Sequence, residues 1–270
     1  MQQANKHVSG HSERPAVAPA ADVAVSLQCV EMRYGPKIVL SDCSMDCKRG
    51  EITCVIGLSG AGKSSILRVI NGLRRPHYGH VFINAVETTR LSEREMIDIR
   101  KKMGFAFQYS ALFDSLTVGE NVAYPLYEHT KMTRAEIRTR VEETLESLGL
   151  EGVDKRMPAE LSGGMQKRVG FARAVVNQPE IILFDEPTTG LDPIMTHVIT
   201  NTIKDMQMKL KATCVVVSHD MPSVYAIADN IAMLFEGTII EYGPVGRIKA
   251  STNPIVQQFL EGSEVGPIPI

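Results

Sequence analysis

The chain has 270 residues, of which 44% are hydrophobic and 22% charged, and its formal net charge at pH 7 is −2. This composition excludes a largely disordered chain, and the weak negative charge excludes a global positive field of the kind that binds nucleic acid through its phosphates. No apolar run approaches the roughly 20 residues of a membrane-spanning helix, and the five cysteines lack metal-ligand spacing, so we expect reduced thiols in a cytoplasmic subunit that reaches membranes through partners.

The N-terminal third of the chain is predicted to consist of a leader followed by strands. Residues 1–24 carry Pro, Ala and Ser without periodicity and no secretion signal, so we expect a disordered leader there. From Val25 the pattern alternates with turn residues, which predicts a small sheet leading into a buried strand that ends near Gly57. A helix over 62–71 should follow.

The remaining pattern indicates an α/β domain with a helical insertion. Short strand patterns return at HVFIN and MGFAFQ, and helical spacing then dominates from about 111 to 178, which predicts an inserted helical subdomain. Strands and helices alternate from IILFDE to TIIEYG, which is typical of a layer with a mainly parallel sheet.

The segment Gly57 to Ser64 reads GLSGAGKS, two glycines separated by four residues and followed by Lys and Ser. A strand before it and a helix after it favour a phosphate-binding loop over an ordinary Gly-rich turn, because backbone amides and the helix N-terminus can surround phosphate oxygens. Lys63 would reach the β- and γ-phosphates, and the Ser64 hydroxyl would bind Mg²⁺. The other predicted phosphate-binding residues are Ser59, Gly60, Ala61, Gly62 and Ser65.

Two carboxylates end the buried-strand pattern IILFDE at Asp185 and Glu186. Alone, this string would indicate only a strand end, but ligands of α/β proteins bind at the carboxyl ends of strands. With a phosphate loop upstream, we expect Asp185 to hold the Mg²⁺ shell and Glu186 to act as the general base for the attacking water.

The LSGGM turn, residues 161–165, begins a predicted helix 23 residues before Asp185 and offers Ser162 and the amides of Gly163 and Gly164 to an anion. A chain that already binds phosphates with its own loop needs no second anion site for the same nucleotide. The turn therefore predicts a composite site completed by a second copy.

These motifs in this order resemble the nucleotide-binding subunits of ABC transporters over about 25–243. The resemblance implies a P-loop NTPase fold with a RecA-like α/β core, an N-terminal antiparallel β subdomain and the helical insertion. It also implies four roles: Tyr34 stacks on adenine, Gln108 joins Mg²⁺ and water to the membrane partner, Asp192 lies in the loop crossing the dimer interface, and His219 contacts the γ-phosphate. Taken alone, Tyr34, Gln108 and His219 could equally be a core or turn tyrosine, an exposed amide and a core histidine.

One residue departs from the family pattern, because Met165 stands where the family usually has Gln. The neighbouring Gln166 is a candidate for a partial substitute. We expect the phosphate contacts of the turn to be unaffected.

A narrower resemblance covers residues 111–130 and the LSGGM variant, which look like the ATPase subunits of Mla (MCE-associated) phospholipid transport systems of Gram-negative bacteria. It implies ATP and Mg²⁺ as cofactors, a head-to-tail homodimer, permease subunits contacted near Gln108 and 111–130, MCE-type and small accessory subunits, no nucleic acid, and a place on the cytoplasmic face of the inner membrane. The alternatives are another ABC importer or exporter, for example for amino acids, a non-transport ABC ATPase, or a regulatory module that senses nucleotide without hydrolysing it.

Residues 244–270 form an expected C-terminal extension, with a helix at IVQQFLEG and an apolar tail containing two prolines. The tail is either a frayed end or, from Val265 to Ile270, a segment that docks on the neighbouring ATPase subunit.

Overall fold

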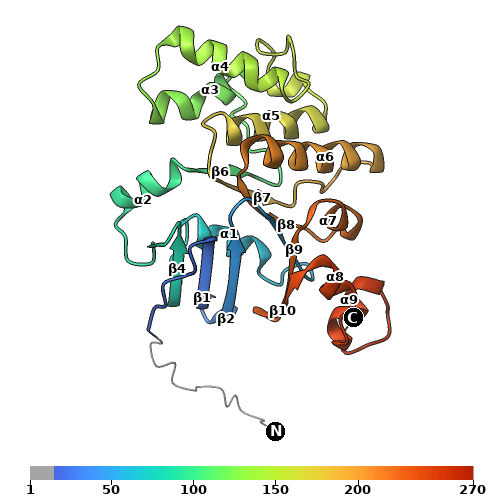
Figure 1. Cartoon of the computed structure of the whole chain (residues 1–270). Coiled ribbons are helices and arrows are strands. Elements are labelled where there is room, and N and C mark those ends of the chain that lie inside the picture. Colours follow the sequence, from blue (N-terminus) through green and yellow to red (C-terminus); the bar gives the residue numbers. More distant parts are fainter. Residues whose placement is uncertain (1–14, 270) are drawn as a thin grey trace.

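The computed structural model describes residues 15–269, and within this range two β-sheets and several layers of helices form the fold (Figure 1). The first sheet is antiparallel, with the strand order β2-β1-β4-β5. Its strands are β1 (Val23–Tyr34), β2 (Lys37–Lys48), β4 (Tyr78–Ile83) and β5 (Val86–Glu87). The long β1–β2 hairpin turns at Gly35, as the turn residues of the sequence indicated.

The second sheet has the order β10-β9-β3-β8-β7-β6, in which all neighbours are parallel except the antiparallel pair β9 and β10. Its strands are β3 (Ile52–Ile56), β6 (Met103–Ala106), β7 (Ile181–Asp185), β8 (Thr213–Val217), β9 (Asn230–Phe235) and β10 (Thr238–Pro244). The predicted α/β class with a mainly parallel central sheet and an antiparallel β subdomain is therefore confirmed.

Helices lie on both faces of this sheet, α1 (Lys63–Ile70) on the side of the antiparallel sheet and α6 (Pro193–Leu210) on the other. The remaining helices of the described residues are α2 (Glu93–Arg100), α3 (Val118–His129), α4 (Arg134–Glu146), the 3-10 helix η1 (Pro158–Glu160), α5 (Gly163–Val175), α7 (Met221–Ile227), α8 (Val245–Lys249) and α9 (Pro254–Glu261). Helices α3 to α5 gather at the end of the molecule away from the antiparallel sheet (Figure 1). This group lies within the stretch predicted to be helical.

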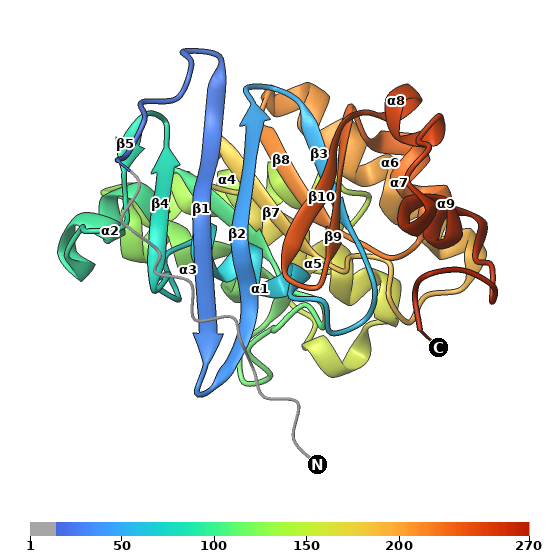
Figure 2. The same cartoon turned by 90° about the horizontal axis from the view of Figure 1, so that it is seen from below.

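Alternation along the buried strands divides the core into two clusters. Ile181 and Leu183 of β7 pack with α1 and the antiparallel sheet, which lies in front of the parallel strands in Figure 2. Ile182 and Phe184 of the same strand pack with the helices on the opposite face. Successive side chains of a strand point to opposite faces, so a strand buried on both sides is apolar throughout, as IILF is.

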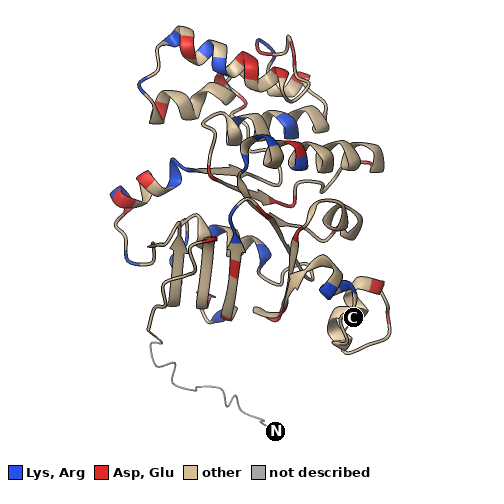
Figure 3. Ribbon diagram, viewed as in Figure 1, with Lys and Arg blue, Asp and Glu red and all other residues tan. Residues whose placement is uncertain are grey.

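Three helices begin with a capping box that can be recognised in the sequence. Each has Ser or Thr followed three residues later by Glu, and both halves of the capping box form at Ser92 for α2, Thr117 for α3 and Thr133 for α4. Helix α2 was not predicted, although its S-x-x-E signal is present. Figure 3 shows charges of both signs alternating along α4, whose apolar residues Ile137, Val141 and Leu145 are buried.

The structure changes the expected boundary of the N-terminal leader. Strand β1 begins at Val23, and Ala24 is only 2% exposed. Before the strand, the backbone of Val17 forms two hydrogen bonds with the side-chain amide of Gln28. Ordered pairing thus precedes the predicted domain start, because backbone pairing does not require the alternating pattern on which that start was based. The rest of the expected leader, residues 1–14, lies outside the described residues.

The C-terminal tail folds back on its own chain. The buried Gln258 of α9 accepts a hydrogen bond from the Ile268 amide at 2.7 Å and donates to the Ile268 carbonyl at 3.2 Å, and the Ile268 side chain is 6% exposed. Val265 remains 87% exposed. Docking on a neighbouring subunit stays a prediction, and Ile268 is already packed within its own chain. In the described part of the chain, every helix is too short or too polar to cross a bilayer.

Candidate functional site

The phosphate loop joins the carboxyl end of β3 to α1 and requires glycine at two close approaches. Gly57 has φ +150°, and a Cβ there would lie 2.3 Å from the Leu234 carbonyl oxygen. Gly62 precedes α1 with φ +107°, and its Cβ would lie 2.8 Å from the Val39 carbonyl oxygen. The loop is thus held against β9 and β2 by backbone contacts that any larger residue would break.

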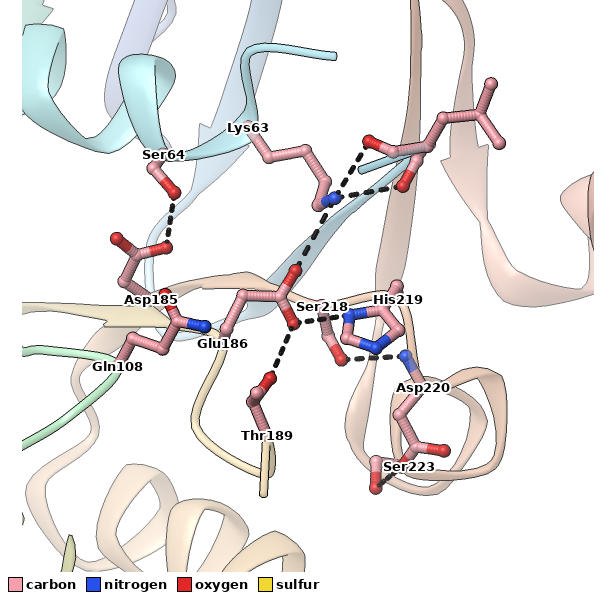
Figure 4. Close-up of polar contacts among 12 residues, drawn as sticks. Lys63, Ser64, Gln108, Asp185, Glu186, Thr189, Ser218, His219, Asp220 and Ser223 are labelled. Carbon is pink, nitrogen blue, oxygen red and sulfur yellow. Dashed lines mark hydrogen bonds and ion pairs between the residues drawn. The ribbon is translucent and has the colours of Figure 1, made fainter. Parts of the chain in front are cut away.

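Lys63 is buried, and its ammonium points back into the loop. Its Nζ donates to the carbonyl oxygens of Gly57 at 2.9 Å and Leu58 at 3.1 Å, and lies 3.4 Å from Oε1 of Glu186. The Lys63 ammonium is therefore held within the loop and faces the carboxylate of Glu186, which follows β7 (Figure 4).

The next residue, Ser64, reaches the end of β7. Its hydroxyl donates to Oδ1 of Asp185 at 2.7 Å across 121 residues of sequence. Burial raises the pKa of Asp185, and the hydrogen bond from Ser64 partly opposes that rise. Two oxygen atoms that suit a small divalent cation thus lie side by side at the start of α1.

Glu186 is held in an uncommon backbone conformation, with φ +47° and its amide donating to the Val217 carbonyl at 3.0 Å. Its Oε2 lies 2.8 Å from Nδ1 of His219 and accepts a hydrogen bond of 3.4 Å from Thr189 (Figure 4). Left-handed geometry at a residue that is not glycine costs of order 1–3 kcal/mol and is common at functional sites. The carboxylate is therefore aimed by its backbone toward Lys63 and His219.

Gln108 follows β6, and its position comes from the sheet. Parallel pairing places Ala106 opposite Phe184, so the chain beyond both strands runs together and brings Gln108 beside Asp185 and Glu186 (Figure 4). Six predicted residues from four separate motifs thus meet at one edge of the sheet: Lys63, Ser64, Gln108, Asp185, Glu186 and His219.

Tyr34 lies at the end of β1, half-buried, where two cations contact it. Arg68 donates to its hydroxyl at 3.3 Å, and the Arg74 guanidinium lies 5.7 Å from the ring centre. Neither arginine belongs to a motif identified in the sequence. Arg68 could have been found, since it lies four residues after Ser64 on the same helix and so on the same face.

The LSGGM turn and Asp192 start two helices and lie outside this cluster. Ser162 accepts a hydrogen bond of 3.4 Å from the Met165 amide at the start of α5. Asp192 accepts two bonds of 2.9 Å from the Ile194 and Met195 amides at the start of α6. No hydrogen bond or ion pair among residues 15–269 joins Ser162, Gly163 or Gly164 to the phosphate loop.

Whether Gln166 substitutes for a glutamine at position 165 stays a prediction, and the structure shows how both side chains are held. Met165 packs partly buried against the core, and the Gln166 amide donates to the carbonyls of Pro158 and Leu161. The side chain of Gln166 is therefore committed to the segment before its own helix.

Comparison with known proteins settles the family. The ABC transporter family matches residues 40–189, the stretch that contains the phosphate loop, the LSGGM turn and the carboxylate pair. The chain belongs to this family. It is thus an ATP-binding and ATP-hydrolysing subunit of an ABC transport system.

Several known proteins are similar to this ABC ATPase over most of its length. The MlaF ATP-binding protein of the Escherichia coli (strain K12) intermembrane phospholipid transport system is 39% identical over 245 residues, 91% of each chain. The probable ribonucleotide transport ATP-binding protein mkl of Mycobacterium leprae is 39% identical over 246 residues, 91% of this chain and 71% of that protein. Among solved structures, the dimeric cassette MJ0796 in a post-hydrolysis state with ADP and Pi has a TM-score of 0.75 and 35% identity, covering 82% of this chain and 98% of that one.

Proposed function

We propose that this ABC ATPase powers Mla-type phospholipid transport between the inner and outer membranes, from the cytoplasmic face of the inner membrane. The observation that carries its chemistry is the convergence of Lys63, Ser64, Asp185, Glu186 and His219 at one sheet edge. The lipid assignment is supported by the similarity to MlaF, which extends over 91% of both chains.

In this proposal the phosphate loop and Tyr34 bind ATP. Lys63 would exchange the carbonyls of Gly57 and Leu58 for β- and γ-phosphate oxygens, since those carbonyls belong to the loop that surrounds the phosphates. Tyr34, steadied by Arg68 and Arg74, offers an aromatic ring to adenine.

Mg²⁺ fits the donor atoms present, because the Ser64 hydroxyl and Asp185 carboxylate are hard oxygen ligands 2.7 Å apart, with the Gln108 amide nearby. The ion would neutralise charge on the phosphate oxygens. Glu186 would orient the attacking water and accept its proton, while His219, hydrogen-bonded to Glu186, would face the γ-phosphate. The left-handed backbone at Glu186 pre-orients that carboxylate.

We further infer a head-to-tail dimer in which each nucleotide lies between one chain's phosphate loop and the partner's Ser162, Gly163 and Gly164. The lack of any bond between these residues and the phosphate loop within the described part of the chain supports the idea, as does the dimeric state of the MJ0796 cassette. Asp192, exposed at the start of α6, would lie at the interface.

Permease subunits would dock beside Gln108. A groove of about 470 Å³ is lined by Phe105, Phe107, Phe113, Tyr124 and Pro125 among others, and Tyr109, the residue after Gln108, is 81% exposed. An aromatic groove whose lining includes Phe107, the residue before Gln108, suits an apolar helix of a membrane subunit. MCE-type and small accessory subunits would complete the assembly.

The catalytic assignment is tested by Glu186→Gln in the full chain, measuring phosphate release with and without the membrane subunits. The amide keeps the size of the side chain but cannot accept the proton, so kcat should fall about 10²–10⁴-fold, and an ATP-bound dimer should accumulate in analytical ultracentrifugation. Glu180→Gln is the matched control and should behave as wild type, since Glu180 is exposed and directly precedes the first residue of β7. Full turnover in Glu186→Gln would remove Glu186 from this role.

The name of mkl favours a second cargo, ribonucleotides, and amino-acid uptake is the remaining transport alternative. Mass spectrometry of small molecules bound to the complex purified from membranes distinguishes the three. Enrichment of phospholipid supports the proposal, whereas enrichment of nucleotides or amino acids without lipid contradicts it.

A further inference from the structure

The loop after β6 is fastened to α5 by two cations. Lys167 donates from Nζ to the Gln108 carbonyl at 2.9 Å. Arg173 donates to the carbonyls of Ser110 at 2.6 Å and Ala111 at 2.7 Å. Residues 107–111, here called the Gln108 loop, therefore have three of their five carbonyl groups held by one helix.

The contact is close as well as polar. Lys167, Gly170 and Arg173 are spaced three apart and so share one side of α5. A Cβ at Gly170 would lie 3.3 Å from Cα of Ser110, so the helix backbone reaches the loop directly. Ser110 and Ala111 have φ of +60° and +45°, a conformation that their carbonyl bonds to Arg173 help to hold.

Lys167 is buried and has fewer acceptors than Arg173. The residue is 8% exposed, and the Gln108 carbonyl is the one acceptor that the described residues provide to its ammonium. Burial lowers the pKa of Lys167, and the nearby Glu186 carboxylate opposes this. Burying a cation against a single neutral acceptor is unfavourable, and a methionine would fill the same space without that cost.

The position of Lys167 along α5 connects two parts of the dimeric mechanism. Lys167 lies three residues after Gly164, about 4.5 Å along the helix axis. The start of α5 would contact the nucleotide bound by the partner, whereas the Lys167 side chain holds Gln108 of its own site. A single rigid turn of α5 thus connects the LSGGM turn to the residue that holds Gln108.

We propose that Lys167 is a positioning residue that couples the LSGGM turn to Gln108 of the same chain, so that a nucleotide engaged by the turn fixes Gln108 in the neighbouring composite site. This inference rests on the proposed head-to-tail dimer. It predicts that the two sites of a dimer communicate through α5.

The test compares three full-length variants. Lys167→Met removes the charge and keeps the stem, and Lys167→Arg keeps a donor. Arg168→Met is the matched control, since Arg168 follows on the same helix and donates to the Leu148 and Gly149 carbonyls, away from the Gln108 loop.

Two quantities are measured for each variant. The first is amide hydrogen exchange of residues 107–113 with and without Mg-ATP, in a Glu186→Gln background. The second is the Mg²⁺ concentration that half-saturates ATP hydrolysis, in the Glu186 background. In Lys167→Met, we expect ATP to lose its protective effect on residues 107–113 and the Mg²⁺ requirement to rise about 10-fold or more, as when an outer-shell partner of a metal ligand is removed. Lys167→Arg should restore both.

Equal effects of Lys167→Met and Arg168→Met, or no effect of Lys167→Met, would overturn the inference. Exchange in 162–165 serves as the dimer control. If ATP protects that turn in the Glu186→Gln parent while residues 107–113 respond alike with and without Lys167, only the coupling fails. If ATP does not protect the turn even in the parent, the proposed dimer fails.

Discussion

Asp192, at the start of α6, has a structural role as a helix cap and a proposed role at the dimer interface, and two substitutions separate these roles. Asp192 caps the helix through two hydrogen bonds of 2.9 Å, to the Ile194 and Met195 amides. Replacing an N-cap Asp with Ala costs about 1 kcal/mol, with a range of about 0.5–2 kcal/mol, because first-turn amides lose their acceptor. We therefore expect Asp192→Ala to lower the free energy of unfolding by about 1 kcal/mol, or to lower Tm by about 2–4 °C.

Asp192→Asn supplies the comparison, since Asn caps a helix about as well as Asp and loses only the attraction of a charge to the helix dipole, about 0.3–1 kcal/mol. Urea unfolding followed by circular dichroism, in EDTA and without nucleotide, measures both variants free of dimerisation. If Asp192→Ala is as stable as wild type, or Asp192→Asn loses more than Asp192→Ala, the capping argument is refuted. If Asp192 also acts at the interface through its charge, Asp192→Asn should lose ATP-driven dimerisation while it stays folded.

Three further substitutions test the carboxylate and the phosphate loop of the site. Because burial raises the pKa of Asp185 above its unfolded value, the folded protein loses stability as pH rises from the ordinary Asp range through the raised pKa. Asp185→Asn in nucleotide-free protein should thus unfold at higher urea than wild type at pH 7, a gain that fades as pH falls toward 4, while hydrolysis is lost; a variant less stable at pH 7 would contradict this. Gly57→Ala should cost about 3 kcal/mol, since a Cβ 2.3 Å from the Leu234 carbonyl adds overpacking to an unfavourable φ, whereas Gly60→Ala, in open space with φ +78°, should cost about 1 kcal/mol. Equal urea midpoints for the two alanine variants would show that contact with Leu234 is not the constraint.

Much of the site could be predicted from local sequence because its motifs carry their own geometry. GLSGAGKS specifies a loop that requires glycine at positions 57 and 62. IILFDE places two carboxylates at the end of a strand that is buried on both faces. Helix starts are equally local, and the missed α2 shows a Ser92–Glu95 signal that was available. The leader boundary was misplaced because Val23 and Ala24 enter β1 through pairing with distant strands.

What sequence alone determined was the inventory of chemical groups and their order along the chain, since turn and strand preferences act over a few residues. Which groups meet was decided by the tertiary structure. Ser64 reaches Asp185 across 121 residues and His219 reaches Glu186 across 33, because the sheet order places β3, β8, β7 and β6 in succession. The Lys167 contact with Gln108 depends on how α5 packs against the end of β6, and such packing follows from the shape of the whole core.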